Sequence, residues 1–249
     1  MKRSLEEAVQ SSEQEETSKQ QKLNSGNGKK QQAPKDLEQI VKKCITEKKY
    51  EDMVKACSLN PEIYKEYRKL KFKQTIYKLD GTLLISNGDD PDNDYIGKLK
   101  KIIRIDFEQV HTLIQLQWYY KKSDIDSKYN NQKQNFSENE VFLTEHTDYA
   151  LVDCINGKCD IITYDEYDQL SSIPANTFYS RAEYNAAKKK FNPPLEKWKK
   201  GCICNVPLNP DLLYVQCDKC SNWIHITCAG LTSEQVETIE NYECKNCKK

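Results

Sequence analysis

An array of cysteines and one histidine near the C-terminus constrains this chain more than any other feature. Its members lie between residues 202 and 247: Cys202, Cys204, Cys217, Cys220, His225, Cys228, Cys244 and Cys247. Thiolate sulfur and imidazole nitrogen are ligands that zinc favours, and a structural zinc ion takes four of them in a closed tetrahedron. The eight ligands therefore predict two structural zinc ions (Zn²⁺).

A disulfide framework is the alternative for so many cysteines. A lysine-rich chain that opens without a secretory signal argues against it. A segment this short buries too little apolar surface to fold alone. Each zinc ion would supply on the order of 10–16 kcal/mol of apparent binding free energy, which acts here as folding free energy.

Composition limits the remaining possibilities. The chain has 249 residues, enough for one or two domains, and its 38 basic and 38 acidic side chains give a net charge of zero. A globally basic nucleic-acid-binding protein is therefore not indicated. The charged fraction of 31% against 37% hydrophobic residues suggests that part of the chain is unfolded. No apolar run approaches the roughly 18 residues of a membrane span, so no membrane partner is expected.

The N-terminal part divides into two regions. Residues 1–34 are rich in Gln, Ser, Lys and Glu and predict a disordered tail. Residues 35–72 predict a helical extension, with apolar residues at helical spacing in 37–45 and 50–57 and a possible third helix at 63–70. The extension either packs on the following domain or binds a partner protein, and the pattern does not separate these two.

From residue 73 the pattern becomes strand-like. Short apolar runs occur at 75–77, 83–85, 95–99, 102–105, 113–120, 140–143 and 160–164. The turn dipeptide Asp80-Gly81 lies between the first two runs. Many short strands joined by polar loops predict a mainly β fold with a barrel-like module.

Four segments of residues 73–190 resemble the BAH (bromo-adjacent homology) domain. They occur in the family's order: WYY at 118–120, EVFLTEH at 140–146, INGKC at 155–159 and FYSRAEYN at 178–185. The resemblance implies a BAH-type β-barrel-like domain over residues 73–190.

The ligand order over residues 201–249 resembles a PHD finger. His225 comes fifth, after four cysteines, whereas a RING domain has its histidine fourth. The PHD resemblance implies a two-zinc cross-brace in which the ligand pairs interleave. One zinc would be held by Cys202, Cys204, His225 and Cys228, and the other by Cys217, Cys220, Cys244 and Cys247.

A BAH domain followed by a PHD finger resembles the small plant reader proteins of the Early Bolting in Short Days and Short Life type. This resemblance runs from about residue 73 to the C-terminus and implies a nuclear chromatin reader that binds the histone H3 tail of the nucleosome. Residues 191–200 are expected to form a basic linker between the modules. Its lysines and the run Lys188-Lys189-Lys190 are either solvated or in weak contact with DNA phosphates.

The PHD resemblance implies a cage for histone H3 trimethylated at lysine 4. Trp223, two residues before His225, stands where such fingers carry a cage tryptophan, and Tyr214 falls on the strand that forms a second wall. Leu208 occupies a position where the plant proteins carry tyrosine, which leaves two aromatic walls. Asp218 is placed to pair with an arginine of the peptide. The alternative is that Trp223 only supports the zinc site by packing.

The BAH resemblance implies a second cage, for histone H3 trimethylated at lysine 27. Tyr95, Trp118 and Tyr120 match its three walls, and His146 and Asp148 match positions that contact the peptide beyond the methylated lysine. Trp118 and Tyr120 alternate along a strand and so share one face. In the alternative interpretation that face is core and His146 is a hydrogen-bonded loop residue.

These patterns favour a non-catalytic protein. No phosphate-binding glycine loop or nucleophile elbow occurs, and zinc ions with four protein ligands have no open position for water. Two alternatives to the reader remain. One is a scaffold subunit whose residues 35–72 recruit a chromatin-modifying complex, and the other is a RING-like ubiquitin ligase, which the ligand order disfavours.

Overall fold

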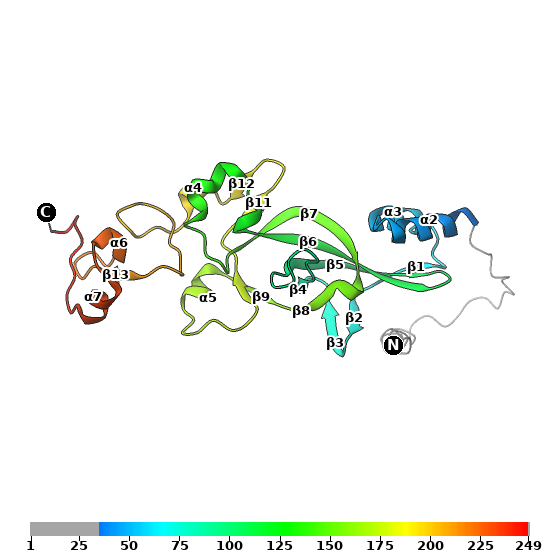
Figure 1. The fold of residues 1–249 in the computed structure, drawn as a ribbon, viewed down its shortest axis with the longest axis horizontal. Helices are drawn as coiled ribbons and strands as arrows, with labels where there is room; N and C mark the ends of the chain where they lie inside the picture. The colour runs from blue at the N-terminus through cyan, green and yellow to red at the C-terminus, as the bar shows by residue number, and fades with distance from the viewer. Residues whose placement is uncertain (1–34, 249) are drawn as a thin grey trace, which may run out of the picture. The chain divides into compact units, whose positions relative to one another are not determined.

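The computed structural model describes residues 35–248, and strands account for most of its regular structure (Figure 1). The predicted tail at 1–34 lies outside the described residues. The strands are β1 Tyr64–Tyr67, β2 Lys69–Phe72, β3 Thr75–Lys78, β4 Thr82–Ile85, β5 Tyr95–Asp106, β6 Val110–Lys121, β7 Val141–Leu151, β8 Ile155–Lys158, β9 Asp160–Ile162, β10 Thr177–Tyr179, β11 Glu183–Asn185, β12 Lys190–Asn192, β13 Tyr214–Gln216 and β14 Trp223–His225.

Helices are short and lie mainly at the two ends of the described chain. The α-helices are α2 Lys35–Thr46, α3 Tyr50–Cys57, α4 Asn130–Lys133, α5 Tyr164–Asp168, α6 Ile226–Ala229 and α7 Ser233–Thr238. The 3-10 helices are η1 Lys122–Asp124, η2 Ser127–Tyr129, η3 Val152–Cys154 and η4 Leu195–Lys197. None of the helices in the described residues has the length and apolar character needed to cross a membrane.

The largest sheet has the hydrogen-bond order β12-β11-β7-β6-β5-β4-β8, and β1 joins it by pairing with β5. Three smaller sheets are the β2–β3 hairpin, the parallel pair β9–β10 and the antiparallel pair β13–β14. The described chain forms two compact units. One comprises the residues up to Trp118 together with His146–Cys159, and the other comprises Tyr119–Glu145 and the residues from Asp160 onward.

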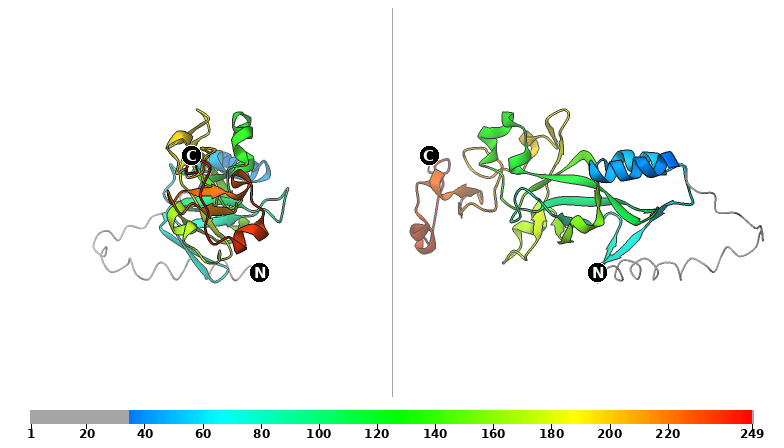
Figure 2. Two further views of the ribbon diagram at one scale, coloured as in Figure 1. Left: turned by 90° about the vertical axis from the view of Figure 1, so that its left-hand side faces the viewer. Right: turned by 45° about the vertical axis from the view of Figure 1, so that its right-hand side comes forward.

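The first unit buries the apolar faces of both its sheet and its N-terminal helices. Leu83, Leu99 and Leu116 contribute to one core cluster. Helices α2 and α3 lie side by side on the strands (Figure 2), and Val41 and Met53 share a second cluster with Ile103 and other residues of β5 and β6. The apolar faces of these two helices thus pack on the following domain.

One local prediction was wrong. The third helix expected at 63–70 is absent, because this stretch forms β1 and part of β2. In β2 burial alternates with a period of two, with Leu70 and Phe72 buried and Lys69 and Lys71 exposed, which is a strand pattern. The turn expected at Asp80-Gly81 is present, since the Gly81 N–H donates to the Lys78 carbonyl oxygen at 3.1 Å, although the strands on either side of it do not pair with each other. Strand β3 pairs back onto β2, and β4 pairs with β5 and β8.

The second unit contains an aromatic core. Phe136, Phe142, Phe191 and Trp198 pack with ring centroids 4.9–5.9 Å apart, mostly edge to face. Phe191 and Trp198 belong to the segment expected to be a basic linker at 191–200, so this segment is anchored by two buried rings. Its lysines at 197 and 199 are exposed.

Candidate zinc centres and aromatic sites

The predicted zinc ligands converge as two groups of four. The groups are Cys202, Cys204, His225 and Cys228, and Cys217, Cys220, Cys244 and Cys247. Within each group the ligand atoms all lie within 4.8 Å of one another. Successive pairs of ligands along the chain therefore alternate between the two groups, which is the interleaved order of a cross-brace.

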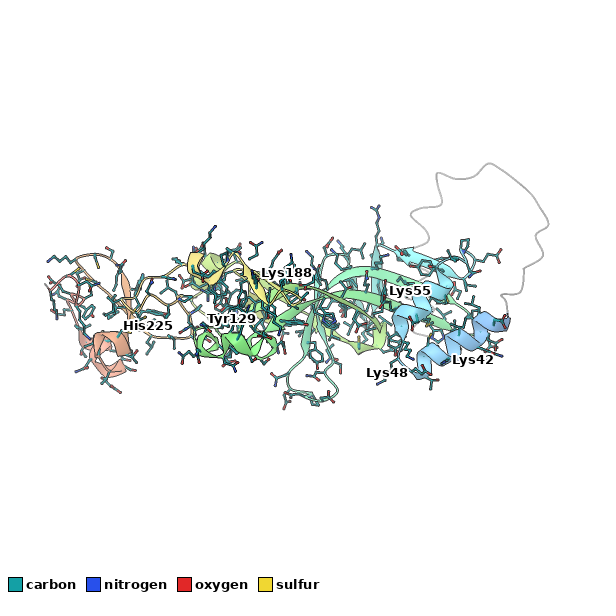
Figure 3. The ribbon with its side chains drawn as sticks, turned by 90° about the horizontal axis from the view of Figure 1, so that it is seen from above. Lys42, Lys48, Lys55, Tyr129, Lys188 and His225 are labelled. Atoms are coloured by element: carbon teal, nitrogen blue, oxygen red, sulfur yellow. The ribbon has the colours of Figure 1, made fainter. Side chains whose placement is uncertain are left out.

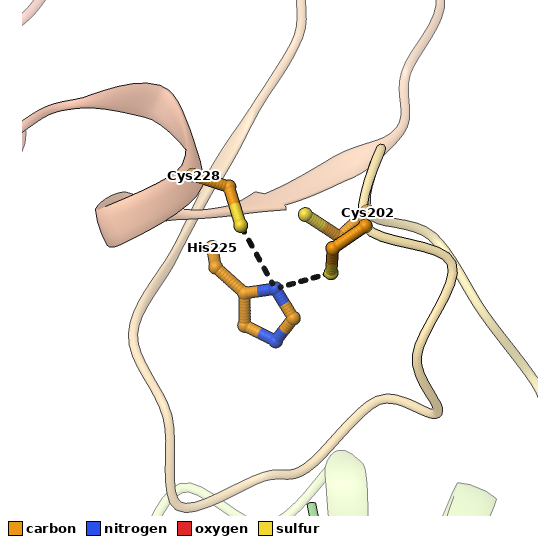
Figure 4. A group of neighbouring side chains, drawn as sticks. Cys202, His225 and Cys228 are labelled. Carbon is orange, nitrogen blue, oxygen red and sulfur yellow. Dashed lines mark hydrogen bonds between the residues drawn. The ribbon is translucent and has the colours of Figure 1, made fainter.

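The spacing of the donor atoms fits zinc. Zinc bonds of about 2.3 Å to sulfur and about 2.0 Å to nitrogen place tetrahedral neighbours roughly 3.5–3.8 Å apart. The Sγ atoms of Cys220 and Cys244 are 3.9 Å apart. His225 Nδ1 lies 3.3 Å from Cys204 Sγ. It lies 3.9 Å from Cys228 Sγ, and both of these residues are labelled in Figure 4. Each group thus offers a complete set of ligands for one structural zinc ion.

Electrostatics at the second group also favour a bound cation. The backbone N–H of Cys244 donates to Cys217 Sγ at 3.3 Å, and this hydrogen bond lowers the pKa of the Cys217 thiol to about 6. Hydrogen bonding with Cys220 raises the pKa of Cys247 to about 12. Four thiols this close cannot all ionise without a cation between them, and zinc binds the thiolate form.

The zinc-binding segment holds a two-stranded sheet with two distinct faces. Val215 and Ile224 pair across β13 and β14 on the buried face. On the other face Tyr214 lies opposite His225, with ring centroids 4.6 Å apart, and Gln216 lies opposite Trp223. Trp223 is 48% exposed, although large aromatic side chains are normally buried in folded domains.

Two predicted wall residues of this segment are engaged in other contacts. The Tyr214 hydroxyl accepts from Asn209 N–H at 2.9 Å and contacts the Asn209 carbonyl oxygen at 3.2 Å. Leu208 is only 7% exposed and lies in a cluster with Tyr164 and Tyr179. Asp218, predicted to bind a peptide arginine, is exposed, and its carboxylate accepts from the backbone N–H of Tyr242 at 2.6 Å. Trp223 is therefore the most accessible of the predicted wall residues in this segment.

The other predicted cage contains an aromatic pair in the first unit. Tyr95 begins β5 and Trp118 lies on β6, and their ring centroids are 6.0 Å apart at 68°, an edge-to-face contact. Tyr95 is 45% exposed, whereas Trp118 is partly buried against the core cluster beneath it. The structure thus brings together two of the three predicted walls.

The remaining predicted BAH residues lie on two strands. Tyr120 belongs to the second unit, where its ring packs against Tyr184 with centroids 6.3 Å apart, and burial raises the pKa of its hydroxyl. His146 and Asp148 are exposed and alternate along β7, which places them on one face of the strand. Asp148 accepts a hydrogen bond from Tyr149 N–H at 2.7 Å.

Comparison with known proteins assigns both modules. A BAH domain model matches residues 75–194, and a PHD-finger model matches residues 202–247. The chain is 31% identical over 184 residues to the chromatin remodeling protein SHL of Arabidopsis thaliana, which covers 74% of this chain and 77% of that protein. This chain belongs to the BAH–PHD family.

Two further similarities were found. The chromatin remodeling protein EBS of Arabidopsis thaliana is 29% identical over 178 residues, covering 72% of this chain and 73% of EBS. The crystal structure of the yeast Rsc2 BAH domain matches 57% of each chain with a TM-score of 0.39 and 20% identity. The BAH–PHD resemblance and the mainly β fold inferred from the sequence are confirmed.

A buried ion pair connects the PHD finger with the part of the BAH domain that shares its compact unit. Arg181 Nε donates to Glu140 Oε1 at 2.5 Å, and its Nη2 donates to Oε2 at 3.0 Å. Arg181 Nη1 donates to the Leu208 carbonyl oxygen of the finger at 2.7 Å. Burial disfavours the charged guanidinium, but its hydrogen bonds and ion pair with Glu140 outweigh burial and raise the pKa of Arg181.

A second contact lies beside the first. Asp211 of the finger accepts from the Ser137 hydroxyl at 2.7 Å and from Glu138 N–H at 2.8 Å. Arg181 and Asp211 were not among the site residues predicted from the sequence. Arg181 lies inside the FYSRAEYN segment that pointed to the BAH domain, so a signal for it was present. Nothing local distinguishes Asp211 from other loop acids.

Proposed function

We propose that this protein is a nuclear, non-catalytic chromatin reader with two methyl-lysine sites. The PHD finger would bind the histone H3 tail trimethylated at lysine 4, and the BAH domain would bind H3 trimethylated at lysine 27. The observation that carries the proposal is that each module leaves one large aromatic ring about half exposed, Trp223 at 48% and Tyr95 at 45%. The BAH–PHD family membership supports the same assignment.

The chemistry of trimethyl-lysine explains why exposed rings suit this role. The modified side chain keeps its positive charge but loses its N–H donors and much of its hydration. Aromatic faces attract such a cation with about 0.5–2 kcal/mol per ring. The edge-to-face arrangement of Tyr95 and Trp118 offers two differently oriented ring surfaces to one cation. We propose that Tyr120 serves as the third wall of this site, and that His146 and Asp148 contact the peptide beyond it.

The PHD site would combine the ring of Trp223 with backbone pairing. The sheet β13–β14 has only two strands, so an extended peptide can add a strand at an edge. Backbone hydrogen bonds would then supply affinity, and Trp223 with Tyr214 would supply preference for the methylated form. Leu208, predicted as a further wall, would act through its docking contacts instead.

The PHD assignment is tested by peptide titration of a Trp223→Ala variant. We expect affinity for the lysine-4-trimethylated peptide to fall by about 2- to 30-fold, the loss of one cation–π contact, while affinity for the unmethylated peptide changes little. The control is Glu237→Ala on α7, an exposed residue outside the proposed site, and zinc content is measured for each variant. Equal discrimination by Trp223→Ala and the unaltered protein would refute the PHD assignment.

The BAH assignment is tested with Tyr95→Ala, because Tyr95 is more exposed than Trp118 and its loss disturbs the core less. We expect weaker binding of the lysine-27-trimethylated peptide and unchanged binding of the lysine-4 peptide. Tyr95→Phe keeps the ring and should retain most of the affinity. Unchanged lysine-27 binding by Tyr95→Ala would show that this face is only structural.

A further inference from the structure

The β2–β3 hairpin concentrates positive charge on an exposed ribbon. In Figure 1 it extends away from the strands of the large sheet. The segment from β1 to the end of β3 carries six exposed basic side chains: Lys65, Arg68, Lys69, Lys71, Lys73 and Lys78. In a chain of zero net charge, this is a strong local separation of charge.

The two faces of the hairpin differ sharply. Leu70, Phe72 and Tyr77 are buried in the core cluster of the first unit. On the outer face Lys69 lies directly opposite Lys78, and Lys71 lies opposite Ile76, which is 50% exposed. Like charges facing each other across a strand pair are destabilising. The outer face therefore brings positively charged side chains close together, an arrangement that suits a polyanionic partner.

Several lysines elsewhere in the same unit form ion pairs with nearby carboxylates. On the helices, Lys42 pairs with Glu38 and Glu108, and Lys55 pairs with Glu51 at 2.7 Å; both lysines are labelled in Figure 3. Among the residues that the structure describes, no carboxylate forms an ion pair with Lys71 or Lys78. Their charges are available to an external partner.

The tip of the hairpin is held in place. Lys73 and Gln74 form the two-residue turn with φ of 46° and 65°, a conformation that residues with a Cβ seldom adopt. Lys73 Nζ lies 3.5 Å from the Ile155 carbonyl oxygen and 5.0 Å from the centroid of the Phe72 ring. The turn and these contacts keep the ribbon ordered before any partner binds, which lowers the entropic cost of binding.

We propose that the outer face of the β2–β3 hairpin binds the phosphate backbone of double-stranded DNA. Alternate lysines along a strand stand about 6.8 Å apart, and DNA carries one phosphate charge per about 1.7 Å of its axis, so several contacts form at once. This site is separate from both methyl-lysine sites, so it can fail or hold independently of them.

The test measures binding of the full chain to a random-sequence 20-base-pair duplex over a range of salt concentrations. Lys71→Gln with Lys78→Gln removes two phosphate contacts. At 0.15 M salt we expect about 30-fold weaker binding and a logarithmic salt slope that is smaller by about 1.8. The matched control is Lys42→Gln with Lys55→Gln, which removes two charges from the same unit and should leave DNA affinity nearly unchanged.

Three further measurements make the outcome decisive. Titration with both methylated H3 peptides checks that the hairpin variant is folded, and their affinities should not change. The run Lys188-Lys189-Lys190, whose segment is tied to Tyr129 through a 3.1 Å hydrogen bond to the Lys189 carbonyl oxygen, is neutralised separately. Polyglutamate serves as a probe for acidic protein surfaces. The proposal is overturned if only the 188–190 variant loses DNA affinity, if both double variants lose it equally, or if the hairpin prefers polyglutamate to DNA.

Discussion

The PHD finger and the BAH domain hold their exposed rings by different means. In the BAH domain, Tyr95 and Trp118 lie above strands whose inward side chains, such as Ile114 and Leu116, are fully buried. In the finger, Trp223 lies on a two-stranded sheet whose small core includes the zinc ligands Cys202, Cys217 and Cys244. The position of the first site therefore depends on apolar packing, and that of the second depends on bound metal.

Removal of zinc should produce the largest difference between the two modules. Each zinc ion contributes on the order of 10–16 kcal/mol of apparent folding free energy to a module of this kind. A chelator should therefore unfold the finger and abolish binding of the lysine-4-trimethylated peptide, while the BAH domain keeps its lysine-27 peptide. Peptide titration before and after chelation, with zinc re-addition as the control, measures this. Parallel loss of both activities would mean that the BAH site also depends on metal.

The buried ion pair that joins the modules should have the next largest effect. In Arg181→Ala, the carboxylate of Glu140 is left buried without its partner, and the Leu208 carbonyl loses its donor. Breaking a buried pair in this way costs about 3–5 kcal/mol. Urea unfolding, monitored by tryptophan fluorescence, measures the loss of stability. Lys199→Ala, which removes an exposed partner of Asp165, is the control and should change stability little. A similar small change for both variants would contradict the structural role of Arg181.

A cavity in the BAH core should have the reverse effect of zinc removal, weakening the BAH domain and leaving the finger intact. Leu116 is fully buried, and Leu116→Ala should cost about 2–5 kcal/mol. The loss should appear in the unfolding of the BAH domain and in weaker lysine-27 peptide binding, with the zinc content unchanged. Leu59→Ala, at a highly exposed position, serves as the control. Zinc loss from Leu116→Ala would show that the finger relies on the BAH core.

The difference between metal binding in the finger and apolar packing in the BAH domain also explains which features could be predicted from the sequence. Zinc ligands have fixed chemistry and regular spacing, so both groups of four, with His225 in the first, followed from residue order together with the PHD resemblance. Strand and helix patterns are weaker signals. The stretch around Leu70 combines apolar residues at spacings that suit either a helix or a strand, and its pairing with β3 decided the outcome. The role of Leu208 depends on tyrosines far away in sequence, which no local pattern reveals.

The smallest expected effect is that of a substitution at Leu208, which tests whether the finger can offer a second aromatic wall. The plant resemblance would suggest that Leu208→Tyr completes an aromatic cage in the finger. In this chain, however, Leu208 is buried against Tyr164, Tyr167 and Tyr179. A larger ring there would overpack the contact and cost about 1–3 kcal/mol. We therefore expect lower stability in urea and no gain in affinity for the lysine-4-trimethylated peptide.

Leu208→Met is the matched control for this substitution, because it conserves volume and should cost less than about 1.5 kcal/mol. The result that would contradict the docking role is a tyrosine variant with unchanged stability and several-fold tighter binding of the methylated peptide. Such a result would place the side chain of residue 208 beside Trp223 in solution. The finger would then resemble the BAH domain in offering more than one accessible ring to the methylated lysine. Gly201 lies close to both Leu208 and Trp223. A Cβ added to Gly201 would come within 3.3 Å of the Trp223 carbonyl oxygen and 3.4 Å of Leu208 Cδ2. There is therefore little free space for the side chain of residue 208 to move beside Trp223.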